Sequence, residues 1–266
     1  MSAGHRVLDA GVVHLWIAPE WQLDESIEAG YRQHMSAEER ESERRFLIEG
    51  ARRLHVLARG LQRKVLASYL PDAEPAALEF VKNPKGRPAL APPFDASGIE
   101  FNLAHTEGMV VMAVCAGMKP GVDIERLGKK VPLAAARRYF SAEEVAALES
   151  LPAEEQPGRF LRLWTLKEAY LKAIGAGIAA GLGTLSFHFD GRGGYRFERA
   201  ADPDAPRWRF QQYVLAPDHL VALACPPGPR ALRVEWHEFF AGAERPVSLV
   251  RSRLMLVSGE EQRSQA

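Results

Sequence analysis

Residues 160–173, FLRLWTLKEAYLKA, form the stretch from which the fold of this chain is best inferred. Its apolar side chains recur at helical spacing, which predicts an amphipathic helix with one face toward a core. The residues expected on that face are Leu163, Leu166, Tyr170 and Ile174. A neighbouring stripe, with members four residues apart, consists of Trp164, Glu168 and Lys172. Charge on so apolar a stretch indicates either an ordinary surface ion pair or a functional site.

The composition indicates an α/β protein of the cytoplasm. Of the 266 residues, 47% are hydrophobic and 26% are charged, which suits one large domain or two small ones. The formal net charge is zero, so a global basic field for nucleic acid is absent. Residues 1–10 do not resemble a signal peptide, and no apolar run approaches the roughly 20 residues that span a bilayer. We therefore expect neither nucleic acid nor a membrane as a partner.

The two cysteines, Cys115 and Cys225, each lie in an apolar run of strand character. Reduced cysteines in the core of a cytoplasmic protein are the plain interpretation, and a disulfide between them stays open.

A faint internal repeat predicts two similar halves. SAEE occurs at Ser36 and again at Ser141, and each copy matches the capping-box pattern of a helix start. Each copy leads to a long helical pattern, at about residues 36–69 and 159–176, and strand-like runs follow each helix. The second half is expected to begin near Gly117. The strand-like runs lie at 12–18, 99–103, 109–116, 185–189, 195–198, 208–215 and 220–225, and residues 232–239 are a further candidate.

Two carboxylates fall on one strand in GVDIE, residues 121–125. Residues two apart on a strand face the same side, so Asp123 and Glu125 point together while Val122 and Ile124 face the core. Two neighbouring carboxylates repel each other, and Mg²⁺, which binds carboxylate oxygens, water and phosphate, would relieve that repulsion. The alternative, more common for an isolated pair, is a solvated strand end or pairing with Arg126.

The other candidate residues are ambiguous when each is taken alone. Glu168 could complete a metal site with three carboxylates, and Lys172, one turn along, could reach a phosphate; an ordinary ion pair is the alternative. In FNLAHT, residues 101–106, His105 and Thr106 follow a strand and offer donors to a phosphate, although a surface or satisfied histidine is common. Further cations lie in the NPKGRP turn and on the first long helix, and each is by itself more often surface charge. They are Lys85, Arg87, Arg52 and Arg53.

The order and spacing of these motifs resemble one enzyme family. GVDIE, followed about forty residues later by the pattern W-x-x-K-E-x-x-x-K, resembles the signature of the 4′-phosphopantetheinyl transferases. The chain length, the upstream FNLAHT and the KGRP turn resemble the larger, Sfp-type branch, over about residues 36–225. The motifs of phosphate-loop NTPases, serine hydrolases and zinc sites, GxxxxGK[ST], GxSxG, CxxC and HExxH, are absent from the sequence.

The resemblance implies a fold and an activity. The fold class is α/β (α+β), with two pseudo-symmetric halves, each a small, mostly antiparallel sheet packed on a long helix. We expect an N-terminal half at 1–116, a C-terminal half at 117–240 that carries the metal-site acids, and a partly disordered extension at 241–266. The enzyme would transfer the 4′-phosphopantetheine moiety of coenzyme A, its co-substrate, to a serine of an apo acyl or peptidyl carrier protein domain. It would depend on Mg²⁺, release adenosine 3′,5′-bisphosphate and act as a monomer.

The resemblance also assigns residues. Asp123, Glu125 and Glu168 match the metal-binding acids, and Lys172 matches a lysine that contacts phosphate. Glu168 and Lys172 are the expected catalytic residues, with Glu168 as the candidate acceptor of the serine proton. The expected coenzyme-binding residues are Arg53, Lys85, Arg87, His105, Thr106, Asp123 and Lys172. Ala104 replaces a serine that is frequent before the histidine, and Arg87 replaces a commoner lysine.

Two other functions stay open. One is a Mg²⁺-dependent phosphodiester or nucleotide hydrolase that uses the same acids, and the other is a non-catalytic protein that binds carriers. An apolar and basic segment after the metal motif is a candidate docking surface for acidic carrier domains. Its members are Lys129, Lys130, Arg137, Arg138, Tyr139 and Phe140.

Overall fold

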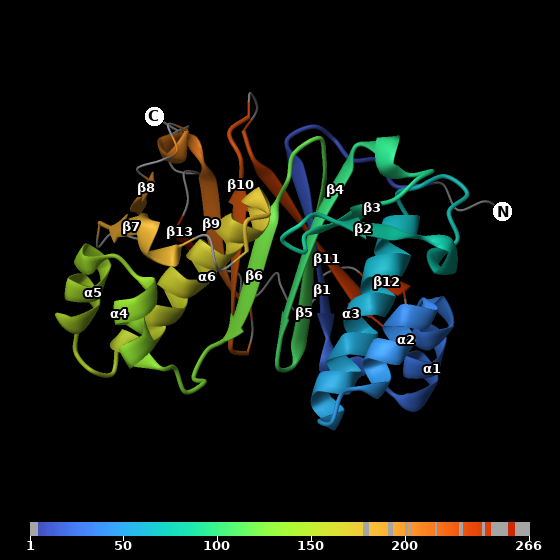
Figure 1. Ribbon diagram of the computed structural model, residues 1–266, viewed down its shortest axis with the longest axis horizontal. Helices are drawn as coiled ribbons and strands as arrows, with labels where there is room; N and C mark the ends of the chain where they lie inside the picture. Colours follow the sequence, from blue (N-terminus) through green and yellow to red (C-terminus); the bar gives the residue numbers. More distant parts are fainter. Residues whose placement is uncertain are drawn as a thin grey trace. The chain divides into compact units, whose positions relative to one another are not determined.

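The chain folds into two compact units, which a computed structural model shows in Figure 1. Unit 1 consists of Met1–Met118 and Arg230–Ser248, and unit 2 consists of Lys119–Pro229 and Leu249–Ala266. The structure describes residues 5–177, 181–190, 194–199, 202, 204–215, 217–228, 231–240, 243–245 and 255–258.

Unit 1 is a five-stranded sheet with its helices packed against one face (Figure 1). The strand order is β12-β11-β1-β5-β4, in which β1 and β11 are parallel and the other pairs are antiparallel. The strands are β1 (Val12–Pro19), β4 (Ile99–Thr106), β5 (Met109–Ala116), β11 (Arg233–Phe240) and β12 (Ala243–Arg245), and a separate hairpin pairs β2 (Phe80–Lys82) with β3 (Pro88–Leu90). The helices are α1 (Glu25–His34), α2 (Ala37–Arg44) and α3 (Glu49–Ala67), with 3-10 turns η1 (Glu20–Gln22), η2 (Pro75–Ala77) and η3 (Asp95–Ser97). Apolar side chains of α3, β1 and β5 form its core.

Unit 2 is a four-stranded antiparallel sheet with α6 packed along it. The strand order is β13-β9-β10-β6. The strands are β6 (Gly121–Arg126), β9 (Arg209–Leu215), β10 (His219–Cys225) and β13 (Met255–Ser258), and a separate hairpin pairs β7 (Leu185–Phe189) with β8 (Tyr195–Arg199). The helices are α4 (Ala136–Tyr139), α5 (Ala142–Glu149) and α6 (Gln156–Ile174), with 3-10 turns η4 (Leu133–Ala135), η6 (Leu182–Thr184) and η7 (Ala205–Arg207). The predicted fold of two α/β halves, each with a mostly antiparallel sheet on a long helix, is confirmed.

The two copies of the internal repeat make the same kinds of side-chain contact in the two units. Ser36 and Ser141 each start a helix with a complete capping box, closed by Glu39 and Glu144 respectively. In each unit the capping glutamate also pairs with a buried cation on the long helix. Glu39 binds Arg63, 24 residues on, and Glu144 binds Lys167, 23 residues on. Each cation also donates to backbone carbonyls, which ties the short helix, the long helix and the following loop together.

The division of the chain differs from the prediction at its C-terminal side. Residues 117–240 were expected to form the second half, but β11 pairs in parallel with β1 and completes the sheet of unit 1. The predicted extension, 241–266, lies outside the described residues except for β12 and β13, which join the sheets of unit 1 and unit 2. The strand pattern at 232–239 was visible in the sequence, but pairing partners distant in sequence are not encoded locally.

Smaller expectations are settled by the structure. Cys115 and Cys225 are buried free thiols, which confirms the plain interpretation. The helical pattern at 36–69 is divided into α2 and α3 by residues 45–48. Among the described residues, none of the helices combines the length and apolar character that crossing a membrane requires.

Candidate functional site

The predicted acids are brought together by the packing of α6 against β6 within unit 2. Asp123 and Glu125 lie opposite Ala222 and Leu220 of β10. Both β10 residues belong to the apolar cluster that includes the buried face of α6. Because directly opposed residues share a face, the two carboxylates project toward the side of the sheet that α6 covers. Val122 and Ile124 are buried, as predicted.

Gly121 allows the close approach of helix and strand. A Cβ atom at this position would meet the backbone carbonyl oxygen of Ala169 and lie 2.5 Å from the backbone nitrogen of Ala173. Any side chain here would have to displace helix backbone, which cannot rotate away. The small residues Gly121, Ala169 and Ala173 therefore set how near the carboxylates of β6 lie to those of α6.

We expect Gly121→Ala to destabilise the protein by about 1–3 kcal/mol, because the added methyl group forces α6 away from β6. The measurement is the urea-unfolding midpoint. Gly158→Ala in the first turn of α6 is the matched control, since no atom lies within 4 Å of its added Cβ. Equal midpoints for the two variants would contradict this account of the contact.

The helix α6 runs unbroken from Gln156 to Ile174, so the predicted stripe exists. Leu163, Leu166 and Tyr170 are buried, as predicted. Trp164 stacks on Phe160 with a centroid distance of 6.0 Å. The stripe therefore has an aromatic end at Trp164 and a charged end at Glu168 and Lys172.

The charged end of the stripe faces β6. Lys172 Nζ donates to Asp123 Oδ1 at 2.6 Å, so Lys172 binds a carboxylate of the strand. Glu125 pairs with Lys129 at 2.5 Å, whereas Arg126, the partner considered from the sequence, pairs with Asp218 at 2.7 Å. Lys172 therefore binds Asp123 while its charge also acts on the buried Glu168, so this is not a solvated surface pair.

Burial dominates the electrostatics of the site. Asp123 and Glu168 are only 6% and 7% exposed, respectively. Burial raises the pKa of Asp123, and Lys172 opposes that rise. Burial, reinforced by the charge of Asp123, raises the pKa of Glu168 to about 7. Glu168 can therefore change its protonation state near neutrality, which a group that exchanges protons with a substrate requires.

Two oxygens of the site lack a donor. Within the described part of the chain, Asp123 Oδ2 and Glu168 Oε1 are buried and have no hydrogen-bond partner. Buried carboxylate oxygens without donors are costly, and a hard cation satisfies them. Oxygen donors of this kind suit Mg²⁺, but the donor atoms of Asp123, Glu125 and Glu168 do not all lie within 4.8 Å of one another, so it is Asp123 and Glu168 that offer the unpartnered oxygens.

The other predicted site residues belong to unit 1. Lys85 is exposed in the β2–β3 turn, and His105 is exposed near the end of β4, followed by half-buried Thr106. Arg87 is mostly buried and donates to the carbonyl of Phe101 at 3.1 Å. Arg53, on α3, pairs with Glu28 at 3.3 Å. Arg87 thus ties the turn to β4, the strand that carries His105.

Sequence reasoning missed the role of Lys167. The residue was only one letter of the pattern W-x-x-K-E-x-x-x-K, yet its side chain is fully buried beside Glu144. It also donates to the carbonyls of Leu182 and Leu185. The second capping box could have indicated this role. Its glutamate, Glu144, needs a positive partner once the helix is buried.

Comparisons with known proteins identify the family of the chain. The family model described as the 4′-phosphopantetheinyl transferase superfamily matches residues 119–224, a range that contains the acids and Lys172. The chain is 37% identical to 4′-phosphopantetheinyl transferase HetI of Nostoc sp. over 168 residues, 63% of this chain and 70% of that protein. It is 35% identical to 4′-phosphopantetheinyl transferase psf-1 of Bacillus pumilus over 189 residues, 70% and 76% of the two chains. It is 29% identical to 4′-phosphopantetheinyl transferase Sfp of Bacillus subtilis over 160 residues, 59% and 69% of the two chains.

Proposed function

Since the chain belongs to the 4′-phosphopantetheinyl transferases, as an Sfp-type enzyme, we propose that it modifies a serine of apo acyl or peptidyl carrier protein domains. Coenzyme A is the donor of the 4′-phosphopantetheine arm, and adenosine 3′,5′-bisphosphate is the other product. The enzyme acts as a monomer in the cytoplasm. The observation that carries this proposal is the pair of buried acids Asp123 and Glu168 beside the half-buried Lys172, with two carboxylate oxygens that have no partner among the described residues.

Asp123, Glu125 and Glu168 are the residues that would hold Mg²⁺. When bound, the ion supplies positive charge to the pyrophosphate oxygens of coenzyme A. In the structure, the positive charge beside these acids comes from two lysines. Lys172 pairs with Asp123, and Lys129 pairs with Glu125. Loading the site would therefore release Lys172 from Asp123 and leave its ammonium group available to a phosphate.

The protein's own contribution is the placement of one proton acceptor and one cation on α6. Glu168 is the group that accepts the proton of the attacking serine hydroxyl. Lys172, one helical turn away, neutralises charge that develops on the leaving phosphate. The serine oxygen forms the new bond to the β-phosphorus, and the bond from that phosphorus to the bridging oxygen breaks. The nucleotide leaves with that oxygen.

We assign the cations of unit 1 to the nucleotide part of coenzyme A. Lys85 and His105 have exposed side chains, and Thr106 offers a hydroxyl beside His105. Arg87 and Arg53 are bound to protein groups, so their positive charge would act from fixed positions.

Incubation with coenzyme A in two arms tests the function. With an apo carrier domain, the nucleotide product is expected to form in equal amount to the modified carrier. With coenzyme A and Mg²⁺ alone, no turnover is expected, whereas a hydrolase would release nucleotide there. A non-catalytic carrier-binding protein would give product in neither arm.

The segment after β6 is the proposed docking surface for the carrier. Arg137 and Arg138 are exposed, and Arg137 pairs only at the surface, with Glu149 at 2.9 Å. Phe140 differs from the prediction, because it is buried against Phe160 and belongs to the core.

Charge reversal at both arginines, Arg137→Glu with Arg138→Glu, is expected to raise the apparent KM for an acidic carrier about tenfold. The KM for coenzyme A should not change. The matched control is Arg44→Glu with Arg45→Glu, a tandem of exposed arginines in unit 1. An unchanged KM for the carrier in the first variant would refute this docking surface.

A further inference from the structure

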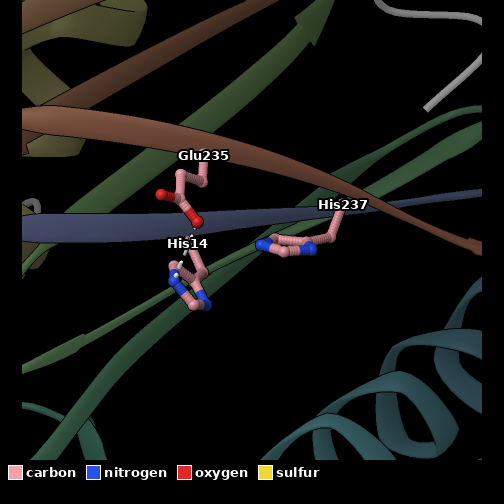
Figure 2. A group of neighbouring side chains, drawn as sticks. All are labelled: His14, Glu235 and His237. Atoms are coloured by element: carbon pink, nitrogen blue, oxygen red, sulfur yellow. Dashed lines mark ion pairs between the residues drawn. The ribbon is translucent and has the colours of Figure 1, made fainter. Parts of the chain in front are cut away.

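A second cluster of possible metal ligands lies in unit 1, on strands β1 and β11. The parallel register places His14 opposite Glu235 and Trp16 opposite His237. Because residues two apart on a strand share a face, both histidines and the glutamate project from one side of the sheet. Each of the three residues offers one donor atom, and these atoms all lie within 4.8 Å of one another. In the described part of the chain, no other three His, Cys, Asp or Glu residues meet this condition. Figure 2 shows the carboxylate of Glu235 beside the ring of His14, with a ring nitrogen of His237 directed toward them.

The orientation of each imidazole ring is fixed by a neighbour. His14 Nδ1 lies 2.7 Å from the hydroxyl oxygen of Tyr69, which also accepts a hydrogen bond from Trp16 Nε1 at 2.9 Å. The ring of His237 stacks on Trp16, with centroids 4.6 Å apart and planes inclined by 20°. Such outer contacts are the ones that orient histidine ligands in metal sites.

The spacing between the donor atoms of His14 and Glu235 suits a small ion. His14 Nε2 lies 3.4 Å from Glu235 Oε2. Two ligands bound to one tetrahedral Zn²⁺ at bond lengths of about 2.0–2.1 Å are themselves about 3.4 Å apart. His14 presents the lone pair of Nε2 to a metal in the tautomer whose Nδ1–H donates to the hydroxyl oxygen of Tyr69.

The charges around the cluster favour neutral imidazoles. Burial lowers the pKa of His14, and burial together with His14 and Arg6 lowers the pKa of His237 to about 4. Neutral rings are the form that binds metals. Arg233 pairs with Glu235 Oε1 at 3.0 Å, which leaves Oε2 directed at His14. Asp9 lies 3.7 Å from Arg233 and offsets part of its charge.

We propose that His14, Glu235 and His237 form a binding site for a divalent transition metal of the zinc class. Two imidazoles and one carboxylate are a donor set that zinc uses when a fourth position is left to water or another ligand. The site is made entirely of unit 1 residues. It is therefore separate from the acids of unit 2, and it does not depend on the transferase function.

Titration of the full-length protein with Co²⁺ tests the proposal, because tetrahedral Co²⁺ with nitrogen ligands absorbs visible light strongly. Saturating Mg²⁺ is present throughout, so that the carboxylates of unit 2 are occupied by a metal that prefers oxygen. We expect one equivalent of Co²⁺ to give the tetrahedral spectrum and one equivalent of Zn²⁺ to abolish it. Glu235→Gln and His237→Ala should each weaken Co²⁺ binding by at least about tenfold.

The matched control is Glu198→Gln. Glu198 pairs with His188 at 3.6 Å, and no third ligand joins this pair among the residues that the structure describes. This variant should bind Co²⁺ as the wild type does. Glu235 is partly exposed, so Glu235→Gln is expected to fold, and its unfolding midpoint is to be checked beside the titration. Absence of the tetrahedral spectrum in the wild type would overturn the proposal, and so would equal binding by Glu235→Gln, His237→Ala and the wild type.

Discussion

Replacing Glu168 with glutamine is expected to reduce transfer to a carrier domain by about 10²–10⁴-fold, the usual contribution of general acid–base catalysis. Glutamine keeps the size of the side chain but cannot accept a proton from serine, and it offers the site one charge fewer. Because Glu168 Oε1 has no hydrogen-bond partner among the described residues, the substitution breaks no contact of that atom. The protein should therefore remain folded, with an unfolding midpoint no lower than that of the wild type.

The control for this variant is Glu143→Gln, an exposed glutamate of α5 in the same unit. It should leave the rate of transfer unchanged. Rates are to be followed as the fraction of modified carrier by mass spectrometry at saturating coenzyme A. Folded Glu168→Gln that transfers at the wild-type rate would exclude Glu168 from both the metal site and the proton transfer.

Replacing Lys167 with methionine is expected to destabilise the protein by about 3–5 kcal/mol, because it leaves the buried carboxylate of Glu144 without its counter-charge. Lys167 is fully buried and donates to one carboxylate and two carbonyls, so all three acceptors lose a donor. The measurement is the free energy of unfolding from urea titration.

Two further variants separate the effect of the buried pair from the loss of any ion pair. Adding Glu144→Gln to Lys167→Met should restore part of the stability, since the uncompensated charge is gone. Arg137→Met breaks an ion pair whose side chains are 75% and 51% exposed, and it should cost no more than about 1 kcal/mol. If Lys167→Met cost as little as Arg137→Met, the buried pair would not be the tie between α5 and α6 that the structure indicates.

Local patterns in the sequence predicted the parts of the fold that depend on local interactions. The two SAEE motifs predicted helix starts, and both are complete capping boxes. Helical spacing predicted the buried face of α6, and strand alternation placed Asp123 and Glu125 on one side of β6. These features depend on residues a few positions apart, so a single sequence contains them.

Pairings between distant segments could not be predicted in the same way. The parallel pairing of β11 with β1 moved residues 233–240 into unit 1 and created the cluster at His14. The burial of Lys167 depends on three separate segments. The binding of Lys172 to Asp123 depends on the close approach of α6 to β6. Gly121 permits that approach, but a glycine in the sequence does not by itself predict it.

The most direct test of the central claim is mass spectrometry of apo acyl and peptidyl carrier domains after incubation with the protein, coenzyme A and Mg²⁺. The predicted result is a gain of one phosphopantetheine on the serine of at least one carrier class, abolished when Mg²⁺ is removed with a chelator. No mass gain on any carrier class, from folded protein with coenzyme A and Mg²⁺ present, would contradict the proposed function.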